Sequence, residues 1–76
     1  MERKLRAIRK ARGLSVKELA EISGVKARSI GKYENGEHRV EGAKIETLAK
    51  LAIALGCRIT DLIDDEELVK LIKKTR

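Results

Sequence analysis

Two short helices joined by a tight turn are the arrangement that residues 13–36 predict. Ser15 and Glu18 have the spacing of a capping box, in which each side chain accepts a hydrogen bond from the backbone amide of the other residue. A helix is therefore expected to begin at about Val16. Gly24 is expected to end this helix, because glycine adopts the left-handed backbone conformation without the steric penalty that a side chain brings.

A second helix is predicted over residues 27–34, after a turn that Val25 fills. Ile30 and Tyr33 recur at helical spacing and give this helix an inward face. A set of positions between these inward residues forms a face of hydrogen-bond donors with no carboxylate among them, which suits phosphates and guanine edges in DNA. Basic residues on a helix are often only solvated surface, but the tight turn before this helix favours DNA binding. The donor-bearing face consists of Lys26, Ala27, Arg28, Ser29 and Lys32.

A set of residues follows a characteristic order from about Leu5 to Ile63. It comprises Leu5, Arg9, Gly13-Leu14-Ser15, Glu18-Leu19-Ala20, Gly24-Val25, Ser29-Ile30, Glu34-Asn35-Gly36, Glu46-Thr47-Leu48, Leu51, Ala54-Leu55-Gly56 and Asp61-Leu62. In this order and spacing the chain resembles the Cro/repressor-type helix-turn-helix family of prokaryotic and phage regulators, also called XRE-like or lambda-repressor-like. The resemblance implies an all-α, five-helix DNA-binding domain, which we place at residues 1–63.

The resemblance also implies roles for individual residues. Arg9 and Glu34 would form a buried or half-buried ion pair between the first helix and the end of the helix over residues 27–34. The sequence agrees, because Arg9 lies one turn after Leu5 on an apolar side, where a guanidinium needs a carboxylate partner; a snorkelling arginine is the alternative. By the family's layout, Ala27, Arg28 and Lys32 would face base edges, and Lys26, Ser29 and Asn35 would lie near the DNA backbone.

Three residues depart from the family pattern. Val16 stands where many relatives have a glutamine that contacts a phosphate, and Lys17 is expected to replace that contact from a different angle. Lys26 stands where relatives place a capping Ser or Thr, and a cation there opposes the helix dipole. Gly31 lies inside the same helix, where glycine is less favourable than alanine by about 1 kcal/mol. We therefore expect this helix to be only weakly stable, with fast amide exchange, until it binds DNA.

The loop over residues 37–44 is longer than the corresponding family loop. The resemblance implies that this loop lies against the DNA backbone, so Arg39 is a candidate phosphate contact. The adjacent His38 is interpreted as solvated surface, because nothing nearby offers it a metal or catalytic partner.

Two further helices are expected after this loop. In the first, apolar residues recur three or four positions apart and are expected to form core, and Gly56 is expected to end it. These positions are Ile45, Leu48, Ala49, Ala52 and Leu55. Thr60 is expected to cap the next helix, which would begin at Asp61, where an acidic side chain complements the helix dipole.

Residues 64–76 lie beyond the resemblance and are expected to form an extra C-terminal helix of the same domain. The acidic residues come first and the basic residues last, as the helix dipole favours. An apolar stripe consists of Leu68, Val69, Leu71 and Ile72. It would be buried against a second copy of the chain or against the monomer's own core, and we favour the homodimer contact.

The charge is concentrated in the half that contains the two-helix arrangement. The net charge is +6, with 11 Lys and Arg against 5 Asp and Glu in residues 1–39 and 7 of each in residues 40–76. The expected partner is nucleic acid rather than a membrane, since no segment pairs a basic face with a broad apolar one. Tyr33 is the only aromatic residue, so stacking platforms for single strands are missing and double-stranded DNA is favoured.

Nothing in the sequence suggests an enzyme, and neither a cofactor nor a metal site is expected. The chain offers one histidine, one cysteine and no phosphate-cradling glycine loop. Cys57 is interpreted as a buried core residue in a reducing cytoplasm. No signal peptide or membrane span is recognised, so a cytoplasmic location is expected.

The sequence thus predicts a dimeric transcriptional regulator, most simply a repressor, that reads the major groove with the helix over residues 27–34. A competing interpretation is a protein-interaction module, or an antitoxin-like DNA-binding partner of a second protein. The departures at Val16, Lys26 and Gly31 keep that interpretation open.

Overall fold

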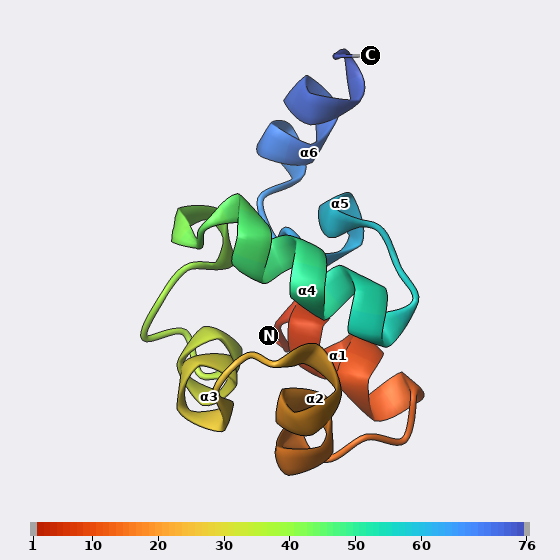
Figure 1. The fold of residues 1–76 in the computed structure, drawn as a ribbon. Helices are drawn as coiled ribbons and strands as arrows, with labels where there is room; N and C mark the ends of the chain where they lie inside the picture. Colours follow the sequence, from red (N-terminus) through yellow and green to blue (C-terminus); the bar gives the residue numbers. More distant parts are fainter. Residues whose placement is uncertain (1, 76) are drawn as a thin grey trace.

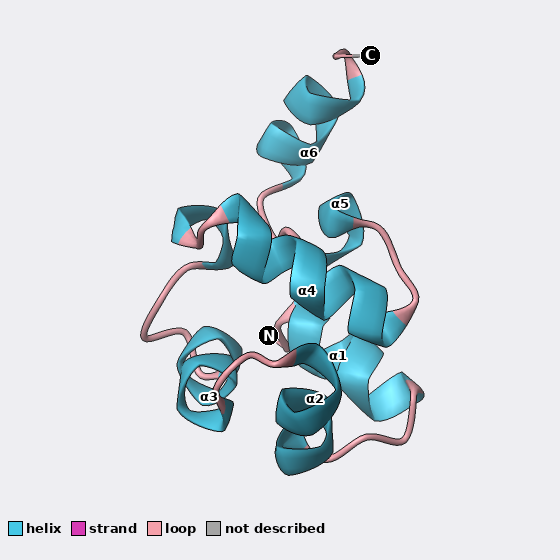
Figure 2. Cartoon of the chain, viewed as in Figure 1, coloured by secondary structure: helices cyan, strands magenta, loops and turns pink. Residues whose placement is uncertain are grey.

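The computed structural model describes residues 2–75, and this part of the chain is built from helices and loops (Figures 1 and 2). The all-α fold class is confirmed, including the additional C-terminal helix. The elements are α1 (Lys4–Ala11), α2 (Val16–Ser23), α3 (Ala27–Glu34), the 3-10 turn η1 (Val40–Gly42), α4 (Ile45–Leu55), α5 (Ile59–Leu62) and α6 (Glu66–Lys73).

The ends of α2 are formed by the residues that the sequence indicates. The Ser15 hydroxyl accepts from the Glu18 amide at 3.0 Å, and the Glu18 carboxylate accepts from the Ser15 amide at 2.9 Å. These hydrogen bonds hold the pKa of Glu18 below its usual range. Gly24 ends the helix with φ 77°, in the left-handed region. The capping box and the glycine stop are both confirmed, and α3 has the predicted bounds.

The hydrophobic core gathers around α4, which crosses the middle of the molecule (Figure 1). Helix α2 packs against both α3 and α4, while α1 contacts α3 and α5. The side chains that are almost completely buried are aliphatic: Leu5, Leu19, Ile30, Leu51, Leu55 and Leu62. Val40 in η1, which no periodic pattern in the sequence indicates, is also buried and joins the same core.

The prediction that Ile45 and Ala49 belong to the core is wrong. Ile45 is 70% exposed and Ala49 is half-buried. With 3.6 residues per turn, positions 45, 49 and 53 form a row that lies off the face made by Leu48, Leu51 and Leu55. Helix α4 therefore turns its Ile45 and Ile53 side chains to the outside.

The predicted start of α5 is also wrong. The helix begins at Ile59, so Thr60 lies inside it rather than capping it, and Ile63 follows it in an extended conformation. The cause is Asp61, whose carboxylate reaches back and accepts from the Arg58 amide at 2.9 Å. An acidic residue at the third helical position thus sets the start at Ile59, two residues before the predicted start at Asp61.

Cys57 is half-buried rather than fully buried, and it packs at the edge of the core. Burial, with the nearby Asp61 carboxylate as a smaller contribution, raises the pKa of its thiol. Because a raised pKa keeps the sulfur protonated at neutral pH, Cys57 behaves as a packing residue there.

Helix α6 projects from the end of the molecule opposite α2 and α3 (Figure 1). Its N-cap is Asp65, whose carboxylate accepts from the Glu67 and Leu68 amides at 3.0 and 3.2 Å. No helix within residues 2–75 combines the length and the apolar character that crossing a membrane requires.

Candidate nucleic-acid interface

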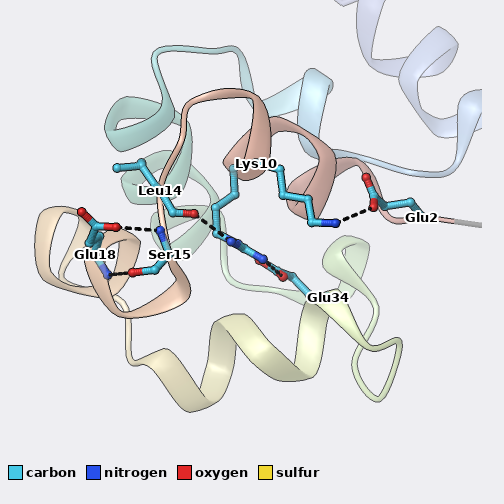
Figure 3. Close-up of polar contacts among 7 residues, drawn as sticks. Glu2, Lys10, Leu14, Ser15, Glu18 and Glu34 are labelled. Atoms are coloured by element: carbon cyan, nitrogen blue, oxygen red, sulfur yellow. Dashed lines mark hydrogen bonds and ion pairs between the residues drawn. The ribbon is translucent and has the colours of Figure 1, made fainter.

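Helix α3 is fastened to α1 by the Arg9–Glu34 ion pair. Arg9 Nε lies 2.7 Å from Glu34 Oε2, and Arg9 Nη2 lies 2.9 Å from Glu34 Oε1. Arg9 Nη1 also donates to the Leu14 carbonyl at 2.8 Å (Figure 3). The two side chains are only 12% and 8% exposed, and the hydrogen bond to Glu34 raises the pKa of Arg9. This bidentate pair holds the end of α3 and the turn before α2 in one arrangement.

The outward face of α3 carries cations that no ion pair within residues 2–75 engages. Lys26 and Arg28 are exposed and Lys32 is half-buried, whereas Ile30 on the opposite side is fully buried. Arg28 and Lys32 are four residues apart, so they lie on the same face of the helix. Ala27 is exposed beside them and Ser29 is half-buried.

The start of α3 suits an anion. Lys26 is the N-cap, in extended conformation, and its side chain makes no capping hydrogen bond. A lysine has no acceptor to offer the first-turn amides. A phosphate placed there would accept from these amides and be favoured by the helix dipole.

Lys17 lies at the second position of α2, exposed, on the helix that packs directly against α3. No ion pair among the described residues involves it. Figure 1 shows α2 and α3 together at one end of the molecule. The cations of the two helices therefore belong to the same end of the fold.

The other two candidate residues lie in the loop that follows α3 and already have polar neighbours. Asn35 is exposed, and its side-chain oxygen accepts from the Glu37 amide at 3.0 Å. Arg39 faces the Glu41 and Asp65 carboxylates at 3.5 and 3.9 Å. Arg39 is itself 75% exposed, and an exposed cation at such distances gains little from a pair, so these carboxylates do not prevent Arg39 from contacting a phosphate.

Most of the basic residues of α1 and its ends have partners within the protein. Lys4 pairs with Glu66 at 2.6 Å, Lys10 with Glu2 at 3.5 Å, and Arg9 with Glu34 as above. Arg12 donates to the Leu55 carbonyl at 2.8 Å, at the end of α4. The sequence did not predict that contact. The only signal for it is Gly56, which marks the end of α4, where the last backbone carbonyls need hydrogen-bond donors.

Residues 5–62 match the model of a protein family described as helix-turn-helix. The match spans α1 to α5 and stops before α6. No curated protein and no solved structure matches the chain.

Proposed function

The chain belongs to the Cro/repressor-type helix-turn-helix family, a family of DNA-binding proteins, and on this premise we propose that it is a sequence-specific transcriptional regulator. In this proposal α3 enters the major groove of duplex DNA. The residues that face base edges are Ala27, Arg28 and Lys32. Those that contact the sugar-phosphate backbone are Lys17, Lys26, Ser29, Asn35 and Arg39.

The observation that carries the proposal is the contrast between the two sides of α3. Its inner side is locked by buried Ile30 and by the Glu34 carboxylate on Arg9. Its outer side presents Arg28 and Lys32, which no described carboxylate neutralises. A row of donors on one face of a helix fits base-edge recognition, because Arg and Lys pair with guanine O6 and N7.

We further propose that the regulator acts as a homodimer through α6. Leu71 is 61% exposed, Leu68 and Ile72 are half-buried and only Val69 is buried, so part of the stripe remains uncovered in the monomer. The helix is acidic at its start and basic at its end. Two antiparallel copies of α6 would therefore place opposite charges next to each other.

Such a dimer would read two half-sites about 10 base pairs apart on one face of the duplex. Repression by occluding a promoter in the cytoplasm is the simplest mode of action, since no effector domain is needed. Neither a cofactor nor catalysis enters this proposal.

Selection of binding sites from a random duplex library at about 150 mM salt tests the proposal. We expect the natural protein to enrich a pseudo-palindrome with one-turn spacing, and the Arg28→Ala, Lys32→Ala double variant to lose the enrichment. The matched control is Lys50→Ala, Arg58→Ala, which removes the same charges from α4 and the start of α5. Failure of the natural protein to enrich any sequence, or equal loss in both variants, would contradict sequence-specific reading by α3.

A second candidate function, binding of a partner protein, is favoured by the outer face of α4. Ile45 is 70% and Ile53 81% exposed on this helix, a degree of apolar exposure that DNA binding by α3 does not explain. In that case the Arg28→Ala, Lys32→Ala variant would keep its partner while losing DNA.

A further inference from the structure

Helix α6 is attached to the rest of the molecule mainly through the segment that leads into it. Of its side chains only Val69 is buried, and Ile63, the last buried residue before it, is followed by Asp64 and Asp65. A helix with so little apolar contact is free to swing unless its connection is held. The contacts of Asp64 and Asp65 therefore decide where α6 points.

Glu41, in η1, holds this connection from one side. A single oxygen, Oε2, accepts from the Asp64 amide at 3.0 Å and from the Asp65 amide at 3.1 Å. The Glu41 side chain is only 13% exposed. Burial alone would raise the pKa of its carboxyl, but the hydrogen bonds from backbone amides outweigh it and place the pKa below its usual range. The carboxylate is thus charged at neutral pH and accepts in its stronger form.

Lys4, at the start of α1, holds the same connection from the other side. Its amide donates to the Asp64 carboxylate at 3.0 Å, and its ammonium lies 2.6 Å from Glu66. The Glu66 pair is exposed and contributes little by itself. The Glu41 side chain is less exposed than those of Lys4 and Glu66, and it binds the backbone rather than a mobile side chain. It is therefore the residue on which the direction of α6 depends most.

We propose that Glu41 is a positioning residue that fixes the direction of α6 and thereby sets the spacing between the two DNA half-sites that the dimer reads. The inference rests on the proposed dimerisation through α6. Glu41 connects the proposed DNA surface to the proposed dimer surface, because it lies in the loop that leaves α3 and contacts the segment that enters α6.

The geometry explains why a small change in the direction of α6, caused by a substitution at Glu41, would alter which DNA sites the dimer binds. The eight residues of α6 span about 12 Å, so a rotation at its base moves the partner's α3 by several ångströms. Adding one base pair between half-sites displaces a half-site by about 3.4 Å and rotates it by about 35°. A dimer whose α6 is held in one direction therefore binds one half-site spacing, whereas a dimer whose α6 is mobile binds several.

The first test measures the connection itself, in the full chain. Hydrogen exchange of the Asp64 and Asp65 amides and NMR relaxation of α6 are compared in the natural protein, Glu41→Ala and Glu41→Gln. We expect Glu41→Ala to accelerate exchange at both amides at least tenfold and to let α6 move separately from α4. Glu41→Gln keeps a side-chain oxygen acceptor and should restore most of the protection. Glu46→Ala, which removes an exposed carboxylate from α4, is the matched control and should change neither measurement.

The second test measures binding of the same variants to duplexes whose half-sites are moved apart or together by one or two base pairs. The natural protein should prefer one spacing by about tenfold or more, which corresponds to about 1.4 kcal/mol. Glu41→Ala should reduce this preference to less than about threefold while its affinity for a single half-site stays within twofold. That single-site affinity separates loss of positioning from loss of folding.

Each outcome decides one point. Loss of spacing preference in Glu41→Ala, with recovery in Glu41→Gln, supports the inference. Unchanged amide exchange at Asp64 and Asp65 in Glu41→Ala would show that the Glu41 hydrogen bonds do not hold the connection to α6. A mobile α6 with an unchanged spacing preference would show that Glu41 does not set the half-site spacing. If the natural protein binds every half-site independently, the dimer proposal fails and the inference fails with it. That failure appears in the natural protein alone and is therefore distinguishable.

Discussion

Individual side chains matter most in this molecule where a charge is removed from water, and Arg9 with Glu34 is the clearest case. Replacing Glu34 with alanine leaves the Arg9 guanidinium, whose side chain is only 12% exposed, without its bidentate partner. We expect a loss of about 3 kcal/mol in the free energy of unfolding, because an uncompensated buried charge is strongly destabilising. Urea denaturation at neutral pH measures it.

The control for this prediction is Glu21→Ala, which removes an exposed glutamate from α2. It should change the free energy of unfolding by less than about 0.5 kcal/mol. A loss in Glu34→Ala as small as in Glu21→Ala would mean that the pair acts like an ordinary surface contact, and that α3 is held by Ile30 alone.

At the scale of elements, α3 has a weak point at Gly31. A Cβ added there would meet nothing within 4 Å, and its φ is not in the left-handed region. Gly31→Ala should therefore stabilise the protein by up to about 1 kcal/mol and slow amide exchange in α3. Thermal unfolding and hydrogen exchange check this. Exchange in the natural α3 that is already as slow as in α4 would contradict the expected weak stability of α3.

Gly36 gives the matched counterpart, one residue after the cap of α3. Its φ is 84°, and an added Cβ would lie 2.7 Å from the Arg3 guanidinium. Gly36→Ala should destabilise the protein by about 1 kcal/mol or more, because alanine is strained in the left-handed region. Two Gly→Ala changes in one part of the chain are thus expected to have opposite signs.

Local sequence signals predicted the bounds of most helices well, but they could not predict contacts between residues far apart in the chain. The bounds of α2 and α3 follow from Ser15, Glu18 and Gly24, which act within one turn of the backbone. The start of α5 was misplaced because Thr60 is an acceptable N-cap, whereas the helix begins after Arg58, whose amide Asp61 binds from the third helical position. Glu41 binds amides 23 and 24 residues away, a contact that no local pattern announces. The resemblance to a family supplied the Arg9–Glu34 pair, which spacing alone left ambiguous.

In the whole molecule, the surface proposed for DNA and the surface proposed for dimerisation lie at opposite ends. Helices α2 and α3 carry, at one end, cations that form no ion pair with any residue in the range 2–75, and α6 projects from the other end (Figure 1). The charge follows the same division, since residues 1–39 carry the whole net charge of +6. In the proposed complex, DNA at the α2 and α3 end leaves the half without net charge free to contact a second copy.

The salt dependence of DNA binding tests whether this division governs affinity. Each phosphate contact releases counterions, so losing one should reduce the slope of log affinity against log salt by about 0.9. Lys26→Ala, at the start of α3, should show this reduction. Lys50→Ala removes the same charge from the exposed side of α4, where Lys50 pairs with Glu46 at 3.2 Å, and should leave the slope unchanged. Titrations over a series of salt concentrations measure both slopes. Equal reductions would mean that overall charge, rather than the α2 and α3 surface, attracts the DNA, because distant exposed charges act only through the screened field of the protein.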